Sequence, residues 1–493
     1  MRQPLVCATA TARTMNELRR GRDAVIGADL VELRLDMVSE PDVAGALSGR
    51  RLPVVVTCRP RWEGGEFDGS EEERKRILAR AAELGAEFID LEWRAGFHDL
   101  VAARAGRGVV LSAHDFDGTP SDLAGRIEAM RATGAEVVKL AVAPERLSDC
   151  ARLLDIGRRE GGNGGLVLIG MGDYGLPTRV LAGRFGSRWT YAGSIRAVGQ
   201  LSVVSLLDEY HFRSIDAETD VYGLAARSVA HSVSPAMHNA AFRAAGINAV
   251  YVPMAAESAD DFLTFARAIG LKGASVTIPH KVALYERVDD VEPAARQVGA
   301  INTIRVAERW TGTNTDVIGF LRPLQRHVPA GELQPLRASI LGAGGAARAV
   351  ATALTSCGCR VVIHARDRSR AAATAAATGA SDGPWPPEPG SWDLLVNCTP
   401  VGIYPRVDET PIRADRLTGR YVYDLIYNPP VTRLLREAAA AGCRTIGGLD
   451  MLVEQAIEQF HWWTGRGIAA EVMRSAALAR LAAFTGEHAE VRS

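Results

Sequence analysis

Short apolar runs rich in β-branched residues recur through about the first 200 residues, and this recurrence constrains the fold more than any other feature. We predict eight strands, at residues 5–8, 30–35, 54–59, 88–93, 109–114, 137–142, 166–170 and 189–193. Segments of helical length lie between most of them, and two, 71–84 and 122–133, end before Gly85 and Gly134, as helix C-caps require. Eight β/α units in about 200 residues predict a (β/α)8 TIM barrel with its active site at the carboxyl ends of the strands. A doubly wound sheet, which also alternates strands and helices, is the alternative.

The chain of 493 residues is too long for one hydrophobic core and is long enough for two or three domains. A helix-like segment, 201–210, follows the last predicted strand, and the polar stretch 211–220 lacks apolar periodicity. We therefore expect a domain boundary there and a second α/β unit that starts at Val221. Within that unit we predict a helix at 371–380 and a proline-rich surface loop at 383–390.

The composition excludes several classes of protein. Apolar residues make up 47% and charged residues 23%, which is ordinary for a globular protein and unlike disordered or fibrous chains. A formal net charge of −1 gives no electrostatic reason to expect nucleic acid or an anionic membrane as partner, and no apolar stretch would span a bilayer. The seven cysteines are scattered without a Cys-x-x-Cys spacing, and the N-terminus does not read as a signal or transit segment. We expect a cytoplasmic protein without disulfides or a bound metal.

A lysine in the sixth predicted strand indicates covalent chemistry. Lys139 lies inside the apolar run EVVKLAVAP, and lysine is rarely buried without a cause. Burial disfavours an ammonium ion, and the resulting free amine forms a Schiff base with a ketone. The protonated imine acidifies the neighbouring carbon, and His114 at the end of the fifth strand is suited to transfer that proton.

Other charged and polar side chains gather at the predicted strand ends. They include Glu32, Arg34, Arg59, Glu63, Glu92 and, after the eighth strand, Gln200. The alternative is that Lys139 extends its ammonium to solvent and His114 is a structural side chain. So many charged groups at one end of a barrel favour the catalytic interpretation.

These segments together resemble a known enzyme family. VELRLD, TCRP followed by EGGEF, SAHDF, VVKLAVAP and AVGQLS are similar to type I 3-dehydroquinate dehydratases over residues 4–212. The resemblance implies a Schiff base between Lys139 and a cyclic keto acid, with His114 as general acid and base and Glu63 orienting it. It also implies substrate contacts from Glu32, Arg34, Arg59, Arg179 and Gln200.

The chain departs from that family in the loop before Gln200. The usual Ser-Ala-Pro-Gly-Gln reads Arg196-Ala197-Val198-Gly199-Gln200 here, and Thr178 replaces a serine that usually precedes the arginine. These replacements change the loop that covers the substrate in the family, while the lysine and the histidine are retained.

A glycine-rich turn in the second half indicates a dinucleotide site. The run from Gly342 to Ala347 follows a predicted strand and opens a predicted helix, so the backbone can approach a pyrophosphate at the helix N-terminus. The next strand ends in Ala-Arg-Asp-Arg, where Arg366 and Arg370 suit the 2′-phosphate of NADP. Asp367 would suit the ribose hydroxyls of NAD, which remains the alternative cofactor.

A lysine and an aspartate upstream of this turn form a second candidate pair. Lys281 in VTIPHK and Asp316 in GTNTD could pass a proton to a carbonyl oxygen while hydride reaches the carbon. Each residue alone is more commonly part of a surface ion pair. In HSVSP, we expect Ser234 to cap the helix that starts at Pro235, beside hydroxyls suited to a carboxylate.

The second half resembles shikimate dehydrogenases from Val221 to about Ala483. The similar strings are HSVSP, VTIPHK, GAINT, GTNTD, GAGGAAR, NCTPVG and GLDMLVEQA. The resemblance implies that Lys281 and Asp316 are the catalytic pair. The implied substrate-binding residues are Ser232, Ser234, Thr277, Asn302, Tyr427 and Gln455. The implied cofactor-binding residues are Gly342, Gly344, Gly345, Ala346, Ala347, Arg366, Arg370, Thr399 and Gly448.

Two further features resemble the fused dehydratase–dehydrogenase family of plants. Ser275 stands where separate shikimate dehydrogenases commonly have asparagine, and the linker YHFRSIDAETDVYG is similar to the plant linker. Arg227 and Ser228 replace a usual Gly-x-Pro. We predict a dehydratase barrel at 1–212 and a linker at 213–220. A shikimate-binding domain at 221–330, completed by helices at 450–485, and a Rossmann NADP-binding domain at 331–449 follow.

The sequence thus predicts that 3-dehydroquinate is dehydrated to 3-dehydroshikimate, which is then reduced with NADPH to shikimate. Three alternatives remain open. The second half could prefer quinate, or use quinate and shikimate with NAD; the barrel could be impaired by the changes at Arg196 and Val198; or the chain could be a non-catalytic regulator of the quinate pathway. Retention of Lys139, His114, Lys281 and Asp316 disfavours the regulator.

Overall fold

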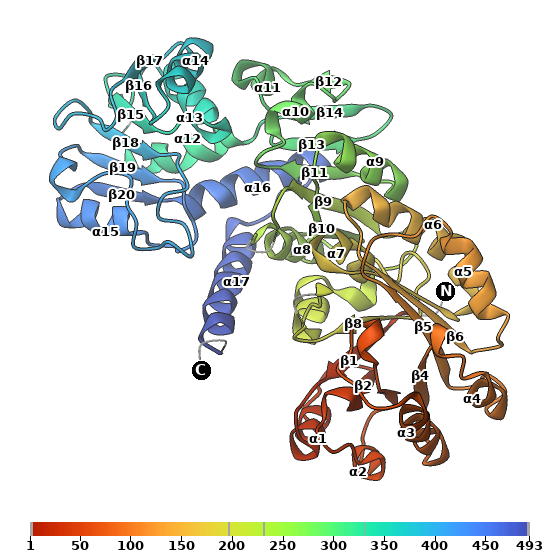
Figure 1. The fold of residues 1–493 in the computed structure, drawn as a ribbon. Coiled ribbons are helices and arrows are strands. Elements are labelled where there is room, and N and C mark those ends of the chain that lie inside the picture. The colour runs from red at the N-terminus through yellow and green to blue at the C-terminus, as the bar shows by residue number, and fades with distance from the viewer. Residues whose placement is uncertain (1–2, 196–197, 230–231, 330, 491–493) are drawn as a thin grey trace. The chain divides into compact units, whose positions relative to one another are not determined.

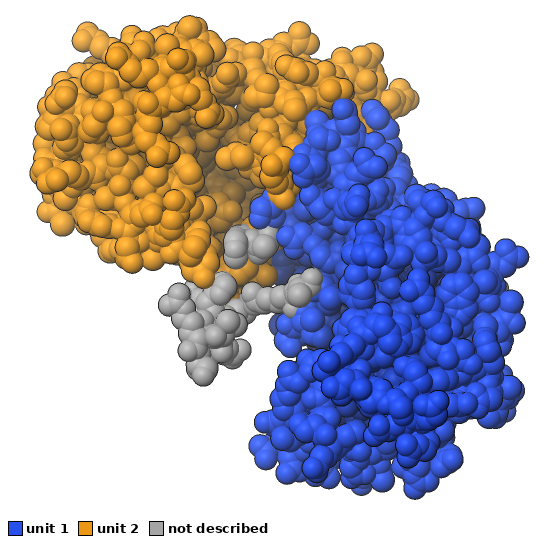
Figure 2. Space-filling model, in the orientation of Figure 1, with its two compact units in different colours: residues 1–221, 228–230, 248–271 blue, residues 222–227, 231–247, 272–493 orange. Residues whose placement is uncertain are grey.

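The computed structural model describes residues 3–195, 198–229, 232–329 and 331–490. The chain forms two compact units (Figure 2). The first comprises residues 1–221, 228–230 and 248–271, and the second comprises the remainder. In the part of the chain that is described, no helix has the length and apolar character needed to cross a membrane.

The first unit contains an eight-stranded parallel sheet that curls into a barrel (Figure 1). Neighbouring strands follow the order β7-β6-β5-β4-β3-β2-β1-β8, and β7 meets β8 at its start, where Arg188 N donates to Leu166 O at 2.7 Å. The prediction of eight barrel strands is confirmed. The strands are β1 Leu5–Ala10, β2 Leu30–Arg34, β3 Val54–Thr57, β4 Phe88–Glu92, β5 Val109–Asp115, β6 Val137–Val142, β7 Leu166–Gly170 and β8 Trp189–Ala192.

Helices cover the outside of this barrel. They are α1 Met15–Asp23, α2 Val43–Leu47, α3 Glu71–Glu83, α4 His98–Ala103, α5 Leu123–Arg131, α6 Cys150–Glu160 and α7 Gly172–Val180. The predicted helix at 71–84 corresponds to α3, which Ser70 caps by accepting a hydrogen bond from Glu73 N at 3.2 Å. The predicted helix at 201–210 is shorter than expected: residues 203–209 are helical, and Ser205–Glu209 form a π-helical turn.

Alternation along the strands separates an outer core from the barrel interior. Val54 and Val56 belong to the cluster between strands and helices, whereas Val55 belongs to the interior cluster. On β6, Val138 and Leu140 face the helices, so Lys139 between them projects into the barrel. Because successive side chains of a strand point to opposite faces, Lys139 lies inside the barrel, where burial affects its chemistry.

The second unit contains two further sheets. In the first, β9 Asp220–Ala226, β11 Gly273–Val276, β13 Thr303–Val306, β14 Trp310–Thr313 and β12 Asp290–Val291 follow one another. Its helices are α8 Ser234–Ala244, α10 Lys281–Tyr285, α11 Pro293–Val298 and α12 Asp316–His327. The segment with β10 Ala249–Ala255 and α9 Ala259–Ile269 belongs to the first compact unit.

The other sheet of this unit has six parallel strands in the order β17-β16-β15-β18-β19-β20. They are β15 Arg337–Leu341, β16 Arg360–His364, β17 Ser381–Gly383, β18 Leu394–Asn397, β19 Tyr421–Asp424 and β20 Arg444–Gly447. Its helices are α13 Gly345–Ser356, α14 Arg368–Thr378 and α15 Arg433–Ala440. After β20 come α16 Gly448–Thr464, which packs against α12, and α17 Ala470–Glu490, which packs against α8 and α16. The strand order reverses between β15 and β18, which is where such sheets bind dinucleotides.

Candidate active sites

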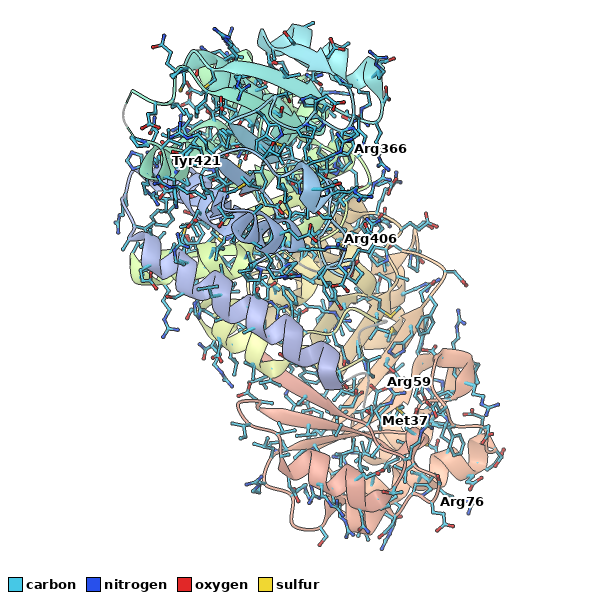
Figure 3. All side chains as sticks on the ribbon, turned by 90° about the vertical axis from the view of Figure 1, so that its left-hand side faces the viewer. Met37, Arg59, Arg76, Arg366, Arg406 and Tyr421 are labelled. Atoms are coloured by element: carbon cyan, nitrogen blue, oxygen red, sulfur yellow. The ribbon has the colours of Figure 1, made fainter. Side chains whose placement is uncertain are left out.

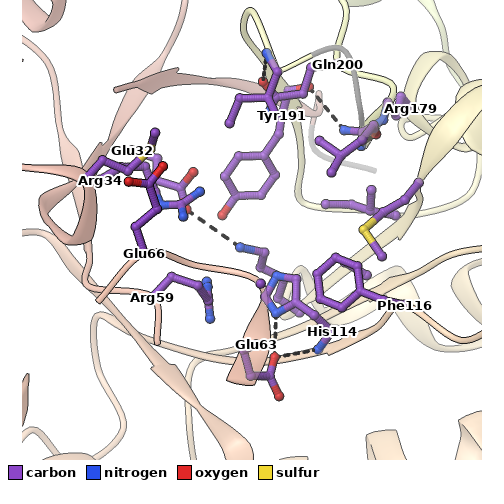
Figure 4. Close-up of a pocket in the computed structure, with 18 residues that line it drawn as sticks. Glu32, Arg34, Arg59, Glu63, Glu66, His114, Phe116, Arg179, Tyr191 and Gln200 are labelled. Carbon is purple, nitrogen blue, oxygen red and sulfur yellow. Dashed lines mark hydrogen bonds and ion pairs between the residues drawn. The ribbon is translucent and has the colours of Figure 1, made fainter. Parts of the chain in front are cut away.

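One cavity of about 250 Å³ opens among the carboxyl ends of the barrel strands (Figure 4). All eight side chains predicted for the barrel site line it: Glu32, Arg34, Arg59, Glu63, His114, Lys139, Arg179 and Gln200. They come from β2, β5, β6 and the segments that follow β3, β7 and β8. Arg59 and Met37, which both line the cavity, are labelled next to each other in Figure 3.

Lys139 is 4% exposed and lies between two carboxylates and an aromatic ring. Its Nζ donates to Asp90 Oδ2 at 3.0 Å and lies 3.7 Å from Glu32 Oε1. The same nitrogen is 4.5 Å from the centroid of the Tyr191 ring. The amine is therefore held by directional contacts in a cavity large enough for a small cyclic acid.

His114 and Glu63 form a buried pair beside the lysine. Glu63 Oε2 accepts a hydrogen bond from His114 N at 2.8 Å and lies 2.8 Å from Nδ1 of the same ring. Burial raises the pKa of Glu63 to about 7, against the opposing effects of Arg59 and the His114 backbone N–H. Burial, with Arg59 and Lys139, lowers the pKa of His114 well below its ordinary value. The imidazole is thus neutral at neutral pH and can accept a proton.

Arg179 is buried without an acidic partner among the residues that the structure describes. Its Nη2 donates to Val198 O at 2.5 Å, its Nη1 reaches Tyr191 O at 3.5 Å, and its Nε has no partner in the described chain. Burial lowers the pKa of Arg179 to about 10. A guanidinium held in this way is suited to bind an anionic ligand group in the cavity.

The structure describes only part of the loop before Gln200, in which the sequence departs from the dehydratase family. Arg196 and Ala197 lie outside the described residues. Val198 lines the cavity and supplies its carbonyl to Arg179, a contact that does not depend on its side chain. Thr178 Oγ1 accepts from Gly170 N at 2.8 Å and donates to Gly175 O at 2.7 Å, so it connects β7 to α7.

In the second unit, hydrogen bonds join four of the predicted side chains. Lys281 Nζ lies 2.5 Å from Asp316 Oδ2, and Asn302 Nδ2 donates to Asp316 Oδ1 at 2.8 Å. Asn302 also lies 3.4 Å from Gln455 Oε1. A Cβ built on Gly345 would lie 3.3 Å from Lys281 Cδ, so the lysine stem passes along the glycine-rich turn. The acid–base pair therefore stands beside the candidate dinucleotide site.

Four other predicted residues are not among those that these hydrogen bonds connect. Thr277 directly follows β11 and Tyr427 follows β19. Ser232 Oγ accepts from Ser234 N at 3.2 Å. The prediction that Ser234 caps α8 was wrong, because Ser234 is the first helical residue and Val233 occupies the N-cap position.

A second cavity, of about 890 Å³, lies at the glycine-rich turn. Five predicted cofactor residues line it: Gly342, Gly344, Arg366, Arg370 and Thr399. Gly342 has φ +107°, and a Cβ there would lie 3.2 Å from Cys398 O, so the turn requires glycine. Gly344 is the N-cap of α13 and brings no side-chain cap, which leaves amide donors for a phosphate. Arg366, in the turn between β16 and α14, is labelled in Figure 3.

The remaining cofactor candidates lie around that turn. Gly345 and Ala346 open α13, and Ala347 packs in the core beneath it. Gly448 opens α16, where a Cβ would lie 2.3 Å from Leu425 O. Asp367 caps α14 by accepting hydrogen bonds from Ser369 N and Arg370 N at 3.0 and 3.1 Å. These cap bonds engage the acid that favoured NAD in the sequence, and both Asp367 and Arg366 line the cavity.

Three family models match this chain. Type I 3-dehydroquinase matches residues 6–217, the shikimate dehydrogenase substrate-binding domain matches 224–304, and the shikimate 5′-dehydrogenase C-terminal domain matches 448–478. The chain is 36% identical to the chloroplastic bifunctional 3-dehydroquinate dehydratase/shikimate dehydrogenase of Arabidopsis thaliana, over 94% of this chain and 82% of that one. The chain belongs to the bifunctional 3-dehydroquinate dehydratase/shikimate dehydrogenase family.

Relatives of the dehydrogenase half are also found alone. A shikimate dehydrogenase (NADP+) of Moorella thermoacetica is 43% identical over 52% of this chain and 92% of its own length. A crystal structure of shikimate dehydrogenase in complex with NADP+ is 35% identical, covers 54% of this chain and 97% of that chain, and superposes with a TM-score of 0.51. The predicted family and the predicted Rossmann sheet are confirmed.

Sequence reasoning missed several residues of the dehydratase site. Asp90, which bonds Lys139, lies on β4 within the run FIDLE, and an acid inside an apolar strand was the available signal. Tyr191 faces Lys139 from β8, while Glu66 and Phe116 line the mouth. Phe116 stacks on His114 at a centroid distance of 6.3 Å, and its ring fills the space over Gly64. Ordinary strand and loop residues such as these are recognised only when the barrel brings them together.

Proposed function

We propose that this chain dehydrates 3-dehydroquinate to 3-dehydroshikimate in the barrel and reduces that product to shikimate in the second unit, with NADPH. The observation that carries the dehydratase assignment is the buried Lys139 amine beside a neutral His114, in one cavity with Arg179, which has no acidic partner among the described residues. Family membership and the paired relative support both halves.

In the barrel, Lys139 Nζ attacks the ketone carbon, and loss of water gives an imine. His114 then removes a proton from the carbon next to the imine carbon, and the hydroxyl on the following carbon leaves with that proton as water. Hydrolysis of the imine releases the product and restores the amine. Glu63 holds the His114 ring through Nδ1, so the other ring nitrogen is directed at substrate. We assign the substrate carboxylate to Arg179 and substrate hydroxyls to Glu32, Arg34, Arg59 and Gln200.

In the second unit, NADPH would, when bound, supply hydride to the ketone carbon. Lys281 and Asp316 hold the proton that the carbonyl oxygen receives, and Asn302 fixes the Asp316 carboxylate. Ser232, Ser234, Thr277, Tyr427 and Gln455 are our proposed substrate contacts. The glycine-rich turn would hold the pyrophosphate, and Arg366 with Arg370 would hold the 2′-phosphate. Arg366→Ala should therefore raise the KM for NADPH and leave that for NADH unchanged, in steady-state assays with each nucleotide.

We also propose the domain division that the sequence predicts: a barrel at 1–212, a linker at 213–220, a shikimate-binding domain at 221–330 with helices at 450–485, and a Rossmann domain at 331–449. The separate sheets support this division. The seven cysteines are all free, which supports a reducing compartment, and we assign the chain to the cytoplasm. The Arabidopsis relative is chloroplastic.

The test supplies purified protein with 3-dehydroquinate and NADPH and follows both enone absorbance and NADPH loss. Lys139→Ala should block NADPH consumption from dehydroquinate, and added dehydroshikimate should restore it. Lys281→Ala should accumulate the enone without consuming NADPH. If wild-type protein consumes NADPH only with dehydroshikimate, the dehydratase assignment fails and Arg196 becomes the first residue to replace. If neither substrate reacts with either nucleotide, the chain is a binding protein, and ligand affinity is the next measurement.

A further inference from the structure

A buried arginine on the outer helix α3 is connected to the active-site lysine through charged side chains. Arg74 is 0% exposed and does not line the cavity. Its Nη1 bonds Glu92 Oε2 on β4 and reaches Cys58 O at 3.4 Å, while its Nη2 bonds Glu71 Oε2 at 2.5 Å. Its guanidinium carbon lies 4.8 Å from the centroid of the Phe97 ring. Burying a guanidinium carries a desolvation cost, which its charged and hydrogen-bonding partners must offset.

From Glu92 the connection continues inward to the lysine. Glu92 Oε1 accepts from Arg59 Nη1 at 2.6 Å, and Arg59 Nη2 lies 3.0 Å from Asp90 Oδ1. Asp90 Oδ2 in turn accepts from Lys139 Nζ at 3.0 Å. Positive and negative groups thus alternate from Arg74 to Lys139, and each charge is fixed by opposite charges on either side. Such a network is sensitive to the loss of any fully buried member, because removing one leaves a buried charge unpaired.

We propose that Arg74 is a positioning residue for the dehydratase reaction: by pairing with Glu92 it fixes Arg59, which fixes Asp90 against the Lys139 amine. This role of Arg74 rests on the proposed dehydratase activity of the barrel. Arg74 touches no substrate and acts only through Glu92.

The charge state of Glu92 gives the proposal a specific signature. Burial raises the pKa of the Glu92 carboxyl; Arg59 and Arg74 oppose this rise, and Asp90 adds to it. Removal of Arg74 raises that pKa further, so Glu92 takes up a proton at a higher pH. Once Glu92 is protonated, Arg59 is paired with only one carboxylate, that of Asp90, and the contact between Asp90 and Lys139 is no longer fixed. Dehydratase activity is then lost as pH falls and returns as pH rises.

The test replaces Arg74 in the full chain and measures the pH dependence of dehydration. Because the pKa of Glu63 is itself about 7, the profiles are recorded in the Glu63→Gln background, which lacks the limb of that carboxyl. There we expect Arg74→Met to move the remaining acid limb of kcat, which Glu92 sets, upward by about one pH unit, and this lowers kcat about tenfold on that limb with KM little changed. Arg74→Lys keeps the positive charge and should keep the limb in place. Glu71→Gln removes the half-exposed partner of Arg74 and is the matched control, expected to leave the profile unchanged. Reduction of added dehydroshikimate reports on the second unit of the same sample.

A double-mutant cycle separates positioning from general support of the fold. If Arg74 acts through Glu92, Arg74→Met should change kcat little when Glu92→Gln is already present. Trapping of the Lys139 imine with borohydride, read by mass spectrometry, should slow in parallel with kcat. Equal effects of Arg74→Met in the two backgrounds, or a lower kcat with an unshifted limb, would overturn the proposal. If Arg74→Met does not fold, Arg74→Lys decides: a limb displaced despite the retained charge also overturns it. Absence of enone formation in wild type would instead reject the dehydratase function itself.

Discussion

The two units each contain a lysine bonded to an aspartate, but the surroundings of the two pairs differ. Lys139 projects from the middle of a barrel strand, 3.0 Å from Asp90, with Glu32 and the Tyr191 ring around it. Lys281 opens the short helix α10, 2.5 Å from Asp316, with its stem along Gly345. The first amine is enclosed where a ketone carbon can reach it, and the second stands beside the cofactor turn. Position, rather than the pair itself, thus separates a proposed nucleophile from a proposed proton donor.

The two aspartates are also held differently. Asp90 is fixed by charged and neutral groups, since Arg59 lies 3.0 Å away and Ser112 Oγ donates to it at 2.5 Å. Although burial acts in the opposite direction, Arg59 and Lys139 lower the pKa of Asp90 well below its usual range. The Asp316 carboxylate accepts from one neutral donor, the Asn302 amide, besides Lys281, and the Asp316 backbone N–H donates to Asn314 Oδ1 at 3.0 Å. The barrel site is therefore an ionic network, and the second site is a mainly neutral one around a single ion pair.

The largest effect is expected from replacing each lysine by arginine. Lys139→Arg keeps a positive charge but offers no nucleophilic amine, so dehydration should fall by more than about 10⁴-fold. Lys281→Arg still offers an N–H donor, so reduction should fall by at most about 100-fold, the low end for a lost general acid. Enone formation and NADPH loss measure the two rates, and each variant serves as the other's control. Equal losses in both variants would mean that the two lysines do the same chemistry.

The next effect concerns Arg179, whose guanidinium is not paired with an acid in the described chain. Arg179→Gln should raise the KM for dehydroquinate by about 10- to 100-fold, because a charge-assisted hydrogen bond contributes roughly 1.5–3 kcal/mol. The KM for dehydroshikimate in the reductase assay should not change. Arg184→Gln, at a neighbouring arginine that bonds backbone carbonyls, is the matched control in the barrel. An unchanged KM in Arg179→Gln would reject the carboxylate assignment.

A smaller effect is expected from pH, and it distinguishes the barrel from the second unit. Burial raises the pKa of Glu63 to about 7, so this carboxyl takes up a proton as pH falls through that value. The protonated carboxyl no longer accepts from His114 Nδ1–H, and the dehydration rate should fall about tenfold per pH unit below 7. Glu63→Gln should give a lower rate without this limb. The control is the reduction of dehydroshikimate, measured over the same pH range. The same acid limb in dehydration and in reduction would contradict the assignment of this limb to Glu63.

The sequence predicted the barrel well because strand-length apolar runs and segments of helical length alternated through about the first 200 residues, and glycines marked two of the helix ends. The apolar run around Lys139 indicated that this lysine is buried. Asp90 and Tyr191 were missed because a strand does not reveal which residues of its neighbours lie opposite; that depends on register between β4, β6 and β8. The sequence left the cofactor preference at Asp367 ambiguous for a related reason. Its preference for capping α14 depends on where the helix starts, which the strand-end motif alone does not determine.

The smallest effect tests the difference between the ionic and the neutral aspartate. Ser112→Ala removes one neutral donor from Asp90, whose contacts with Arg59 and Lys139 remain, so dehydration should slow only about threefold, within the net value of one neutral hydrogen bond. Asn302→Ala removes the amide that holds Asp316 Oδ1, and the reduction rate should fall by about tenfold. Stopped-flow rates with saturating substrate measure both. Because a fixed charge on one side compensates for a lost hydrogen bond, a larger loss in Ser112→Ala than in Asn302→Ala would mean that Arg59 does not hold Asp90 in place.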